Sequence, residues 1–299
     1  GYDALDSYIR DNPFFGTITG RYANRIVNGR FSLNDREYQL STNLPPHHCH
    51  GGDKGFDKVV WKANLITNDR GVSLAMTYVS PDGEEGYPGT LNINVTYSLT
   101  DNDAFTIDYE ATTDKPTIIN VTNHSYFNLK DSGRSSALDH LMMINADNFT
   151  PVDKDVIPIG EIQSVKGTPF DFLEPTIIGA RINQDNQQLK FGSGYDHNFI
   201  LRESEERLRF AAKVQELTNG RIMEVWTSEP GVQFYSGNVF DGSGSITGKG
   251  GVTYPHRSGF CLETQHYPDS PNKSNFPSTV LNPGETYRST TQYIFSVSD

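Results

Sequence analysis

A strict alternation of apolar and polar residues over positions 91–99 (LNINVTYSL) is the feature that most constrains the fold of this chain. A period of two places one set of side chains in a core and the other in solvent, as in a half-buried strand. The pattern returns over 105–111 (FTIDYEA) after a polar turn at 100–103. The two segments therefore predict an antiparallel hairpin.

Further segments predict strands because each is short, rich in β-branched or aromatic residues, and bounded by turn-forming residues. They are 72–79, 117–123, 208–214, 221–227, 231–236, 258–265 and 292–298. A short helix is expected only within 176–190. Many short strands and 27 glycines in 299 residues are typical of an all-β protein. We predict a large antiparallel β-sandwich with few short helices, folded as one domain over 1–299.

The net charge of the chain limits the classes of partner that we expect it to bind. It carries 25 basic and 37 acidic residues, a formal net charge of -12. Such a chain repels phosphate backbones and anionic membranes, so we expect neither nucleic acid nor a membrane as partner. A neutral small molecule is the expected substrate, and a phosphorylated one is disfavoured for the same reason.

The sequence gives little support for a bound cofactor or metal. A glycine-rich phosphate loop and a CxxC pair are both absent from the sequence, so no nucleotide cofactor is expected. His47, His48, Cys49 and His50 stand too close together for one zinc ion to take all four, so no metal is expected either. Cys49 and Cys261 form no disulfide framework, and the first residues lack a secretion signal, which favours a cytoplasmic location.

Polar residues inside strand-like segments are the candidates for chemistry. In 259–265 (GFCLETQ), alternation places Cys261, Glu263 and Gln265 on one face. A carboxylate within such a strand is costly unless it is paired or faces a binding site, and the residues alone do not decide between these two. In 118–128 (IINVTNHSYFN), His124 continues a line of hydrogen-bonding groups and is followed by aromatic residues. Sugar sites combine such groups, although a lone histidine is more often a satisfied core residue.

Four shorter segments offer further binding groups. His50 precedes two glycines that allow a tight turn, and Asp196 follows glycines at a loop–strand junction. Asn24 and Arg25 stand in a segment that could equally be a solvated basic turn. Gln233 alternates with apolar residues in 230–235, so its amide needs a partner from the protein or from a substrate.

Taken together, these segments resemble the galactose mutarotase (aldose 1-epimerase) family. The resemblance covers nearly the whole chain, with the family's motifs in the family's order. They are 13–16 (PFFG), 20–25 (GRYANR), 50–52 (HGG), 55–57 (GFD), 80–89 (SPDGEEGYPG), 123–128 (NHSYFN), 195–199 (YDHNF), 230–235 (PGVQFY) and 259–265 (GFCLETQ).

The resemblance implies a galactose mutarotase-like supersandwich without a cofactor, acting on a free hexose. It implies that Glu263 is the general base and His124 the general acid of ring opening. By position, the residues that hold the sugar hydroxyls would be His50, Asp196, Asn24, Arg25 and Gln233. In the family several strands precede the segment that matches 1–6, so we expect this domain to lack them or to be part of a longer fused polypeptide.

Three other functions compete with a mutarotase. A non-catalytic carbohydrate-binding β-sandwich would explain the polar face but not the pairing of Glu263 with His124. A glycoside hydrolase or lyase usually needs two carboxylates, and Asp196 is a weak partner for Glu263. A sugar-phosphate epimerase would require more cationic residues around the site.

Overall fold

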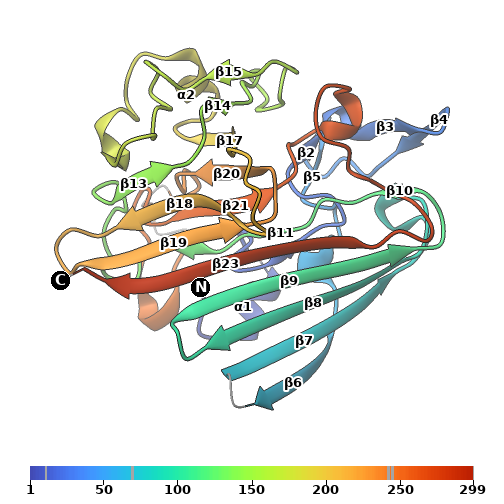
Figure 1. Cartoon of the computed structure of the whole chain (residues 1–299), viewed down its shortest axis with the longest axis horizontal. Coiled ribbons are helices and arrows are strands. Elements are labelled where there is room, and N and C mark those ends of the chain that lie inside the picture. Colours follow the sequence, from blue (N-terminus) through green and yellow to red (C-terminus); the bar gives the residue numbers. More distant parts are fainter. Residues whose placement is uncertain (11, 69–70, 241–242, 244–245, 299) are drawn as a thin grey trace.

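The computed structural model describes residues 1–10, 12–68, 71–240, 243 and 246–298. Its largest element is an antiparallel sheet of nine strands, which Figure 1 shows running across the lower half of the molecule. In spatial order the strands are β16 (Thr176–Ile177), β13 (Leu141–Ile144), β18 (Arg209–Gln215), β19 (Arg221–Thr227), β23 (Tyr287–Val297), β9 (Ala104–Thr113), β8 (Leu91–Thr100), β7 (Gly71–Ser80) and β6 (Lys62–Asn68).

A second antiparallel sheet of six strands packs against one end of the first. Its order is β12 (Tyr126–Phe127), β21 (Phe260–Gln265), β20 (Gly231–Tyr235), β17 (Asp196–Ile200), β14 (Asn148–Phe149) and β15 (Gln163–Ser164). Thr264 on β21 shares a 2.5 Å hydrogen bond with Thr291 on β23, and the Tyr293 hydroxyl donates to the Leu262 carbonyl at 3.2 Å. The back face of β21 therefore packs on the large sheet, and its alternate residues point the other way.

Short elements complete the described fold (Figure 1). The two α-helices are α1 (Leu5–Arg10) and α2 (Gln187–Phe191). The remaining strands form two-stranded ribbons: β1 (Ile18–Thr19) with β11 (Thr122–Asn123), β2 (Arg25–Ile26) with β5 (His48–Cys49), β3 (Arg30–Leu33) with β4 (Arg36–Gln39), and β10 (Thr117–Ile118) with β22 (Val280–Leu281). Single 3₁₀ turns are Val27–Gly29, Phe56–Lys58, Glu84–Gly86, Ile178–Ala180, Lys249–Gly251 and Ser270–Asn272.

The predicted hairpin is confirmed, because β8 and β9 pair in continuous register from Leu91–Thr113 to Leu99–Phe105. The alternating residues of β8 divide as expected, with Leu91, Ile93 and Val95 buried at its start. In the described part of the chain no helix has the length and apolar character that a membrane crossing requires.

The short helix expected within 176–190 is present at the end of that segment, whereas the strand expected over 117–123 is interrupted. Helix α2 spans Gln187–Phe191, and the Asn186 side chain caps its start by accepting from the Gln188 and Leu189 amides. Earlier in that segment β16 pairs with β13. The strand expected over 117–123 divides into β10 and β11, since the side chain of Asn120 between them exchanges hydrogen bonds with the backbone of His266.

Candidate active site

Three adjacent strands of the six-stranded sheet carry the polar face of the site. Gln233 on β20 is paired with Asn198 on β17 and with Glu263 on β21, so their side chains share one face. Asp196 lies two residues along β17 from Asn198 and accepts a 2.6 Å hydrogen bond from the Gln233 amide. Gln233 and Glu263 are each only 2% exposed, which makes this an unusually buried set of polar groups.

Loops from the first half of the chain supply two histidines that face the polar side chains of the six-stranded sheet. His124 directly follows β11, and His50 directly follows β5 in the left-handed backbone region, with φ at 49°. A Cβ atom on the next residue, Gly51, would lie 1.7 Å from the Gly20 carbonyl oxygen. Glycine is therefore required to bring the His50 loop this close to 20–25.

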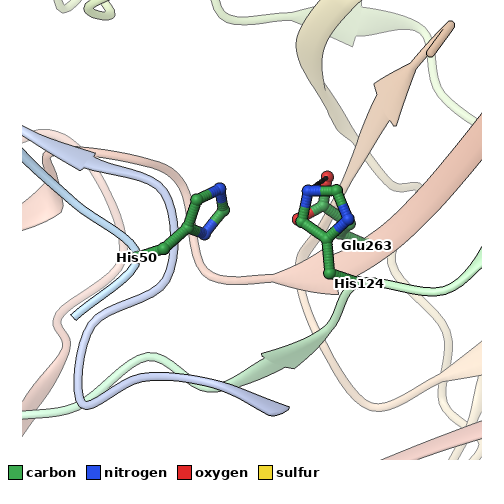
Figure 2. Close-up of side chains that lie close together, drawn as sticks. All are labelled: His50, His124 and Glu263. Carbon is green, nitrogen blue, oxygen red and sulfur yellow. Dashed lines mark ion pairs between the residues drawn. The ribbon is translucent and has the colours of Figure 1, made fainter. Parts of the chain in front are cut away.

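His50, His124 and Glu263 converge on one point. A ring nitrogen of each histidine and a carboxylate oxygen of Glu263 lie within 4.8 Å of one another. His124 Nε2 is 3.7 Å from Glu263 Oε1, and Figure 2 shows His50 beside this pair, on a separate loop. The three side chains thus surround a space in which one small polar group could meet all of them.

The other predicted site residues join the same network. Arg25 contacts Asp196 through an ion pair of 3.4 Å. The Asn24 side-chain oxygen accepts from the Arg25 backbone amide at 2.9 Å, while the Asn24 backbone amide donates to His50 Nδ1 at 3.2 Å. Together with the Gln233–Asp196 hydrogen bond, these contacts link all seven residues into one region.

Burial shifts the proton affinities in this region. It raises the pKa of Glu263 well above its usual range; the Asp196 charge adds to this rise, and Arg25 opposes it. Burial lowers the pKa of His124 to about 4 and that of His50 well below its usual range. Near neutral pH burial therefore favours two neutral imidazoles, and it shifts the Glu263 carboxyl group toward its protonated form.

The hydrogen bond to His50 disfavours a metal at this cluster. A backbone N–H can only donate, so His50 Nδ1 must accept from Asn24 and the ring proton must sit on Nε2. Histidines that bind metals usually donate through their second nitrogen instead. The histidines within 47–50 have different hydrogen-bond partners. His47 Nδ1 accepts from the Asn28 amide, and His48 Nε2 contacts the Tyr87 hydroxyl at 2.5 Å.

Two residues of the site had no role assigned from the sequence. The Phe14 ring lies against both imidazoles, with centroids 4.8 Å from His50 and 5.6 Å from His124, and Phe14 has a positive φ of 62°. Cys261 Sγ lies 3.5 Å from His124 Nδ1. Strand alternation had placed Cys261 on the same face as Glu263, but only the fold reveals that it meets His124.

Comparison with known proteins decides the family. The family model for aldose 1-epimerase matches residues 1–294. The galactose mutarotase of Bos taurus is 47% identical over 298 residues, which cover 100% of this chain and 83% of the relative. The aldose 1-epimerase of Escherichia coli is 41% identical over 297 residues, covering 99% of this chain and 84% of the relative.

The chain belongs to the aldose 1-epimerase family. A crystal structure of galactose 1-epimerase from Lactobacillus acidophilus superposes with a TM-score of 0.88 at 30% identity, covering 100% of this chain and 85% of that one. The aldose epimerase homologue from C. elegans gives a TM-score of 0.89 at 27% identity, covering 100% and 87%. The family confirms the predicted all-β supersandwich and the predicted enzyme class, an isomerase, and nothing in these comparisons favours the non-catalytic alternative.

Proposed function

We propose that this chain interconverts the α and β anomers of free aldohexoses such as galactose, with Glu263 and His124 as the catalytic pair. The observation that carries the assignment is the 3.7 Å approach of His124 Nε2 to Glu263 Oε1, beside His50. His124 and Glu263 are separated by more than a hundred positions in the sequence. Their convergence supplies two proton-transferring groups within reach of one hemiacetal.

The reaction needs two proton movements on neighbouring oxygens. A base removes the proton from the anomeric O1 hydroxyl, and an acid protonates the ring oxygen O5. The C1–O5 bond then breaks to give an open-chain aldehyde, rotation about C1–C2 exposes the other carbonyl face, and reversal closes the opposite anomer. Glu263 acts as the base and His124 as the acid, each contributing roughly 100- to 10,000-fold.

The proton inventory of the pair fits this chemistry. A protonated Glu263 with neutral His124 holds as many protons as an ionised Glu263 with an imidazolium. Burial favours the first form, because it raises the pKa of Glu263 and lowers that of His124. Moving one proton within the pair reaches the reactive form, so no exchange with solvent is required.

The remaining residues hold the sugar. Asp196, fixed by Arg25 and Gln233, presents carboxylate oxygens that can accept from hydroxyl groups. His50 keeps its proton on Nε2 and is therefore a fixed donor toward a sugar oxygen. Arg25, the cation of this network, is already paired with Asp196, which supports an uncharged sugar over a phosphorylated one.

Polarimetry on freshly dissolved α-galactose tests the proposal. We expect the protein to accelerate the approach of optical rotation to equilibrium well beyond the buffer rate, without added metal or nucleotide. Binding of galactose with no acceleration would identify a carbohydrate-binding module and overturn the proposal. Release of reducing ends from oligosaccharides without mutarotation would identify a hydrolase instead.

The cellular setting is part of the same proposal. Cys49 and Cys261 are both free thiols, which supports the reducing environment of the cytoplasm. Cell fractionation followed by polarimetry of each fraction tests this, and activity confined to a secreted fraction would contradict it. Whether the domain belongs to a longer fused polypeptide is tested by the size of the endogenous protein on an immunoblot.

A further inference from the structure

The two histidines of the site differ in what faces their second ring nitrogen. At His50, the Asn24 backbone amide donates to Nδ1 at 3.2 Å. Because that amide has no lone pair to offer, His50 cannot carry a second proton without losing this contact. At His124, Nδ1 faces the Cys261 sulfur at 3.5 Å.

A thiol suits a proton-transferring imidazole because its sulfur can accept a hydrogen bond without bringing a charge. Glu263 lies on the Nε2 side of the ring, so the proton that His124 exchanges is the one on Nε2, and Nδ1 keeps its proton. Nδ1–H can then donate to the Cys261 sulfur in both the neutral ring and the imidazolium. A carboxylate at this position would hold the imidazolium too firmly, and a backbone N–H would forbid it.

The position of Cys261 supports this role. It is 0% exposed and lies two residues from Glu263 on β21, so both side chains face His124 from the same strand. Burial raises the pKa of its thiol well above the usual range, with Glu263 and Asp196 adding to the rise. The group therefore stays a protonated thiol and brings no charge of its own to the site.

We propose that Cys261 is a positioning residue for His124: its sulfur accepts the Nδ1–H hydrogen bond, which leaves Nε2 as the nitrogen that loses and gains the second proton. His124 is then the histidine that transfers protons, and His50 is a hydrogen-bond donor whose state does not change. The proposal rests on the proposed mutarotase activity and adds to it a physical reason why the two histidines have different tasks.

Two substitutions at Cys261 separate hydrogen bonding from packing. Cys261→Val keeps similar volume but has no group to pair with Nδ1, whereas Cys261→Ser keeps a group that can both donate and accept. We expect Cys261→Val to lower kcat by roughly tenfold or more, since general acid catalysis depends on the proton of His124. KM for galactose should be nearly unchanged in both variants, and Cys261→Ser should retain most of kcat.

Nitrogen-15 NMR of histidine-labelled protein provides an independent readout. The His124 Nδ1 resonance should shift in Cys261→Val and remain close to its wild-type position in Cys261→Ser. Circular dichroism and thermal unfolding establish that each variant is folded, and Cys261→Ala replaces Cys261→Val if the branched side chain prevents folding.

The outcomes distinguish this proposal from the activity on which it rests. Wild-type kcat and an unshifted His124 resonance in Cys261→Val would overturn it, as would equal losses in the serine and valine variants. If the unmodified protein fails to accelerate mutarotation, the proposed function fails. The NMR comparison would still decide whether Cys261 controls the state of His124.

Discussion

The two sheets of the sandwich use their polar residues in opposite ways. In the nine-stranded sheet, β18 and β19 present Lys213 and Glu224 to solvent as an ion pair of 3.0 Å, with side chains 42% and 31% exposed. In the six-stranded sheet, β21 is buried on both faces although it contains Glu263 and Gln265. The first arrangement is the usual one for a strand that separates core from solvent.

The second arrangement costs stability. Glu263 Oε2 and Gln265 Oε1 are buried and have no hydrogen-bond partner among the described residues. Unpaired buried polar groups cost roughly 1–3 kcal/mol each in proteins. The comparison indicates that the large sheet, with the core that it shares, supplies stability, whereas the buried polar face of the smaller sheet, where we propose the chemistry takes place, lowers it.

Replacing the base should have the largest effect on activity. Glu263→Gln keeps the shape of the side chain but removes its ability to take a proton, so kcat should fall by roughly 100- to 10,000-fold. Polarimetry gives the rate, and equilibrium binding of galactose serves as the control because affinity should change far less. Wild-type turnover in this variant would remove Glu263 from the mechanism.

The same variant should be more stable than the wild type at high pH. Since burial raises the pKa of Glu263, the folded state binds its proton more tightly than the unfolded state. Stability is then lost as pH rises from the ordinary glutamate pKa through the raised one. The melting temperature of Glu263→Gln should exceed that of the wild type at pH 8, and the difference should shrink toward pH 4.5. A constant difference would refute the assigned pKa.

The difference between the sheets also explains what the sequence could predict. Strict alternation marked β8 and β9 correctly because one face of each strand is solvated. The strand β6 was missed because Lys62–Asn68 lacks alternation and its described side chains are exposed. The short helix expected within 176–190 begins only after the Asn186 cap, because the start of that segment pairs with β13.

The sequence pattern was also limited in what it could predict about the site. Alternation placed Cys261 and Glu263 on one strand face, but their approach to His124 depends on how β11 and β21 are brought together in space. The family resemblance named all seven residues that the structure now connects. It assigned no role to Phe14, whose contact with both imidazoles arises from a left-handed backbone turn that no periodicity signals.

A cavity in the core of the large sheet should reduce stability without reducing specific activity. Ile107 on β9 is 0% exposed, so Ile107→Ala should cost about 2–5 kcal/mol in the free energy of unfolding. Denaturant unfolding measures the loss, and kcat per folded molecule should remain that of the wild type. Leu262→Ala on β21 is the matched variant, since it should lose comparable stability and also lower kcat by displacing Glu263.

Breaking the ion pair of the site should affect binding more than turnover. Asp196→Asn removes the charge that holds Arg25 and leaves only a neutral amide oxygen to accept from Gln233. Hydrogen bonds to charged groups are worth about 1.5–3 kcal/mol, so KM for galactose should rise roughly ten- to a hundredfold. Asp147→Asn, which breaks the exposed Arg202–Asp147 pair, is the control and should leave KM unchanged. Equal KM values in the two variants would contradict the assignment.

The smallest effect should come from the solvated face of the large sheet. Lys213→Ala removes an ion pair with Glu224 that solvent largely screens, so the free energy of unfolding should change by less than about 1 kcal/mol. The rate of mutarotation should be that of the wild type, because Lys213 faces solvent on β18, away from the site. A loss comparable to that of Ile107→Ala would mean that this sheet also depends on its polar residues. The contrast would then fail between a nine-stranded sheet that supplies stability and a six-stranded sheet that carries the proposed active site.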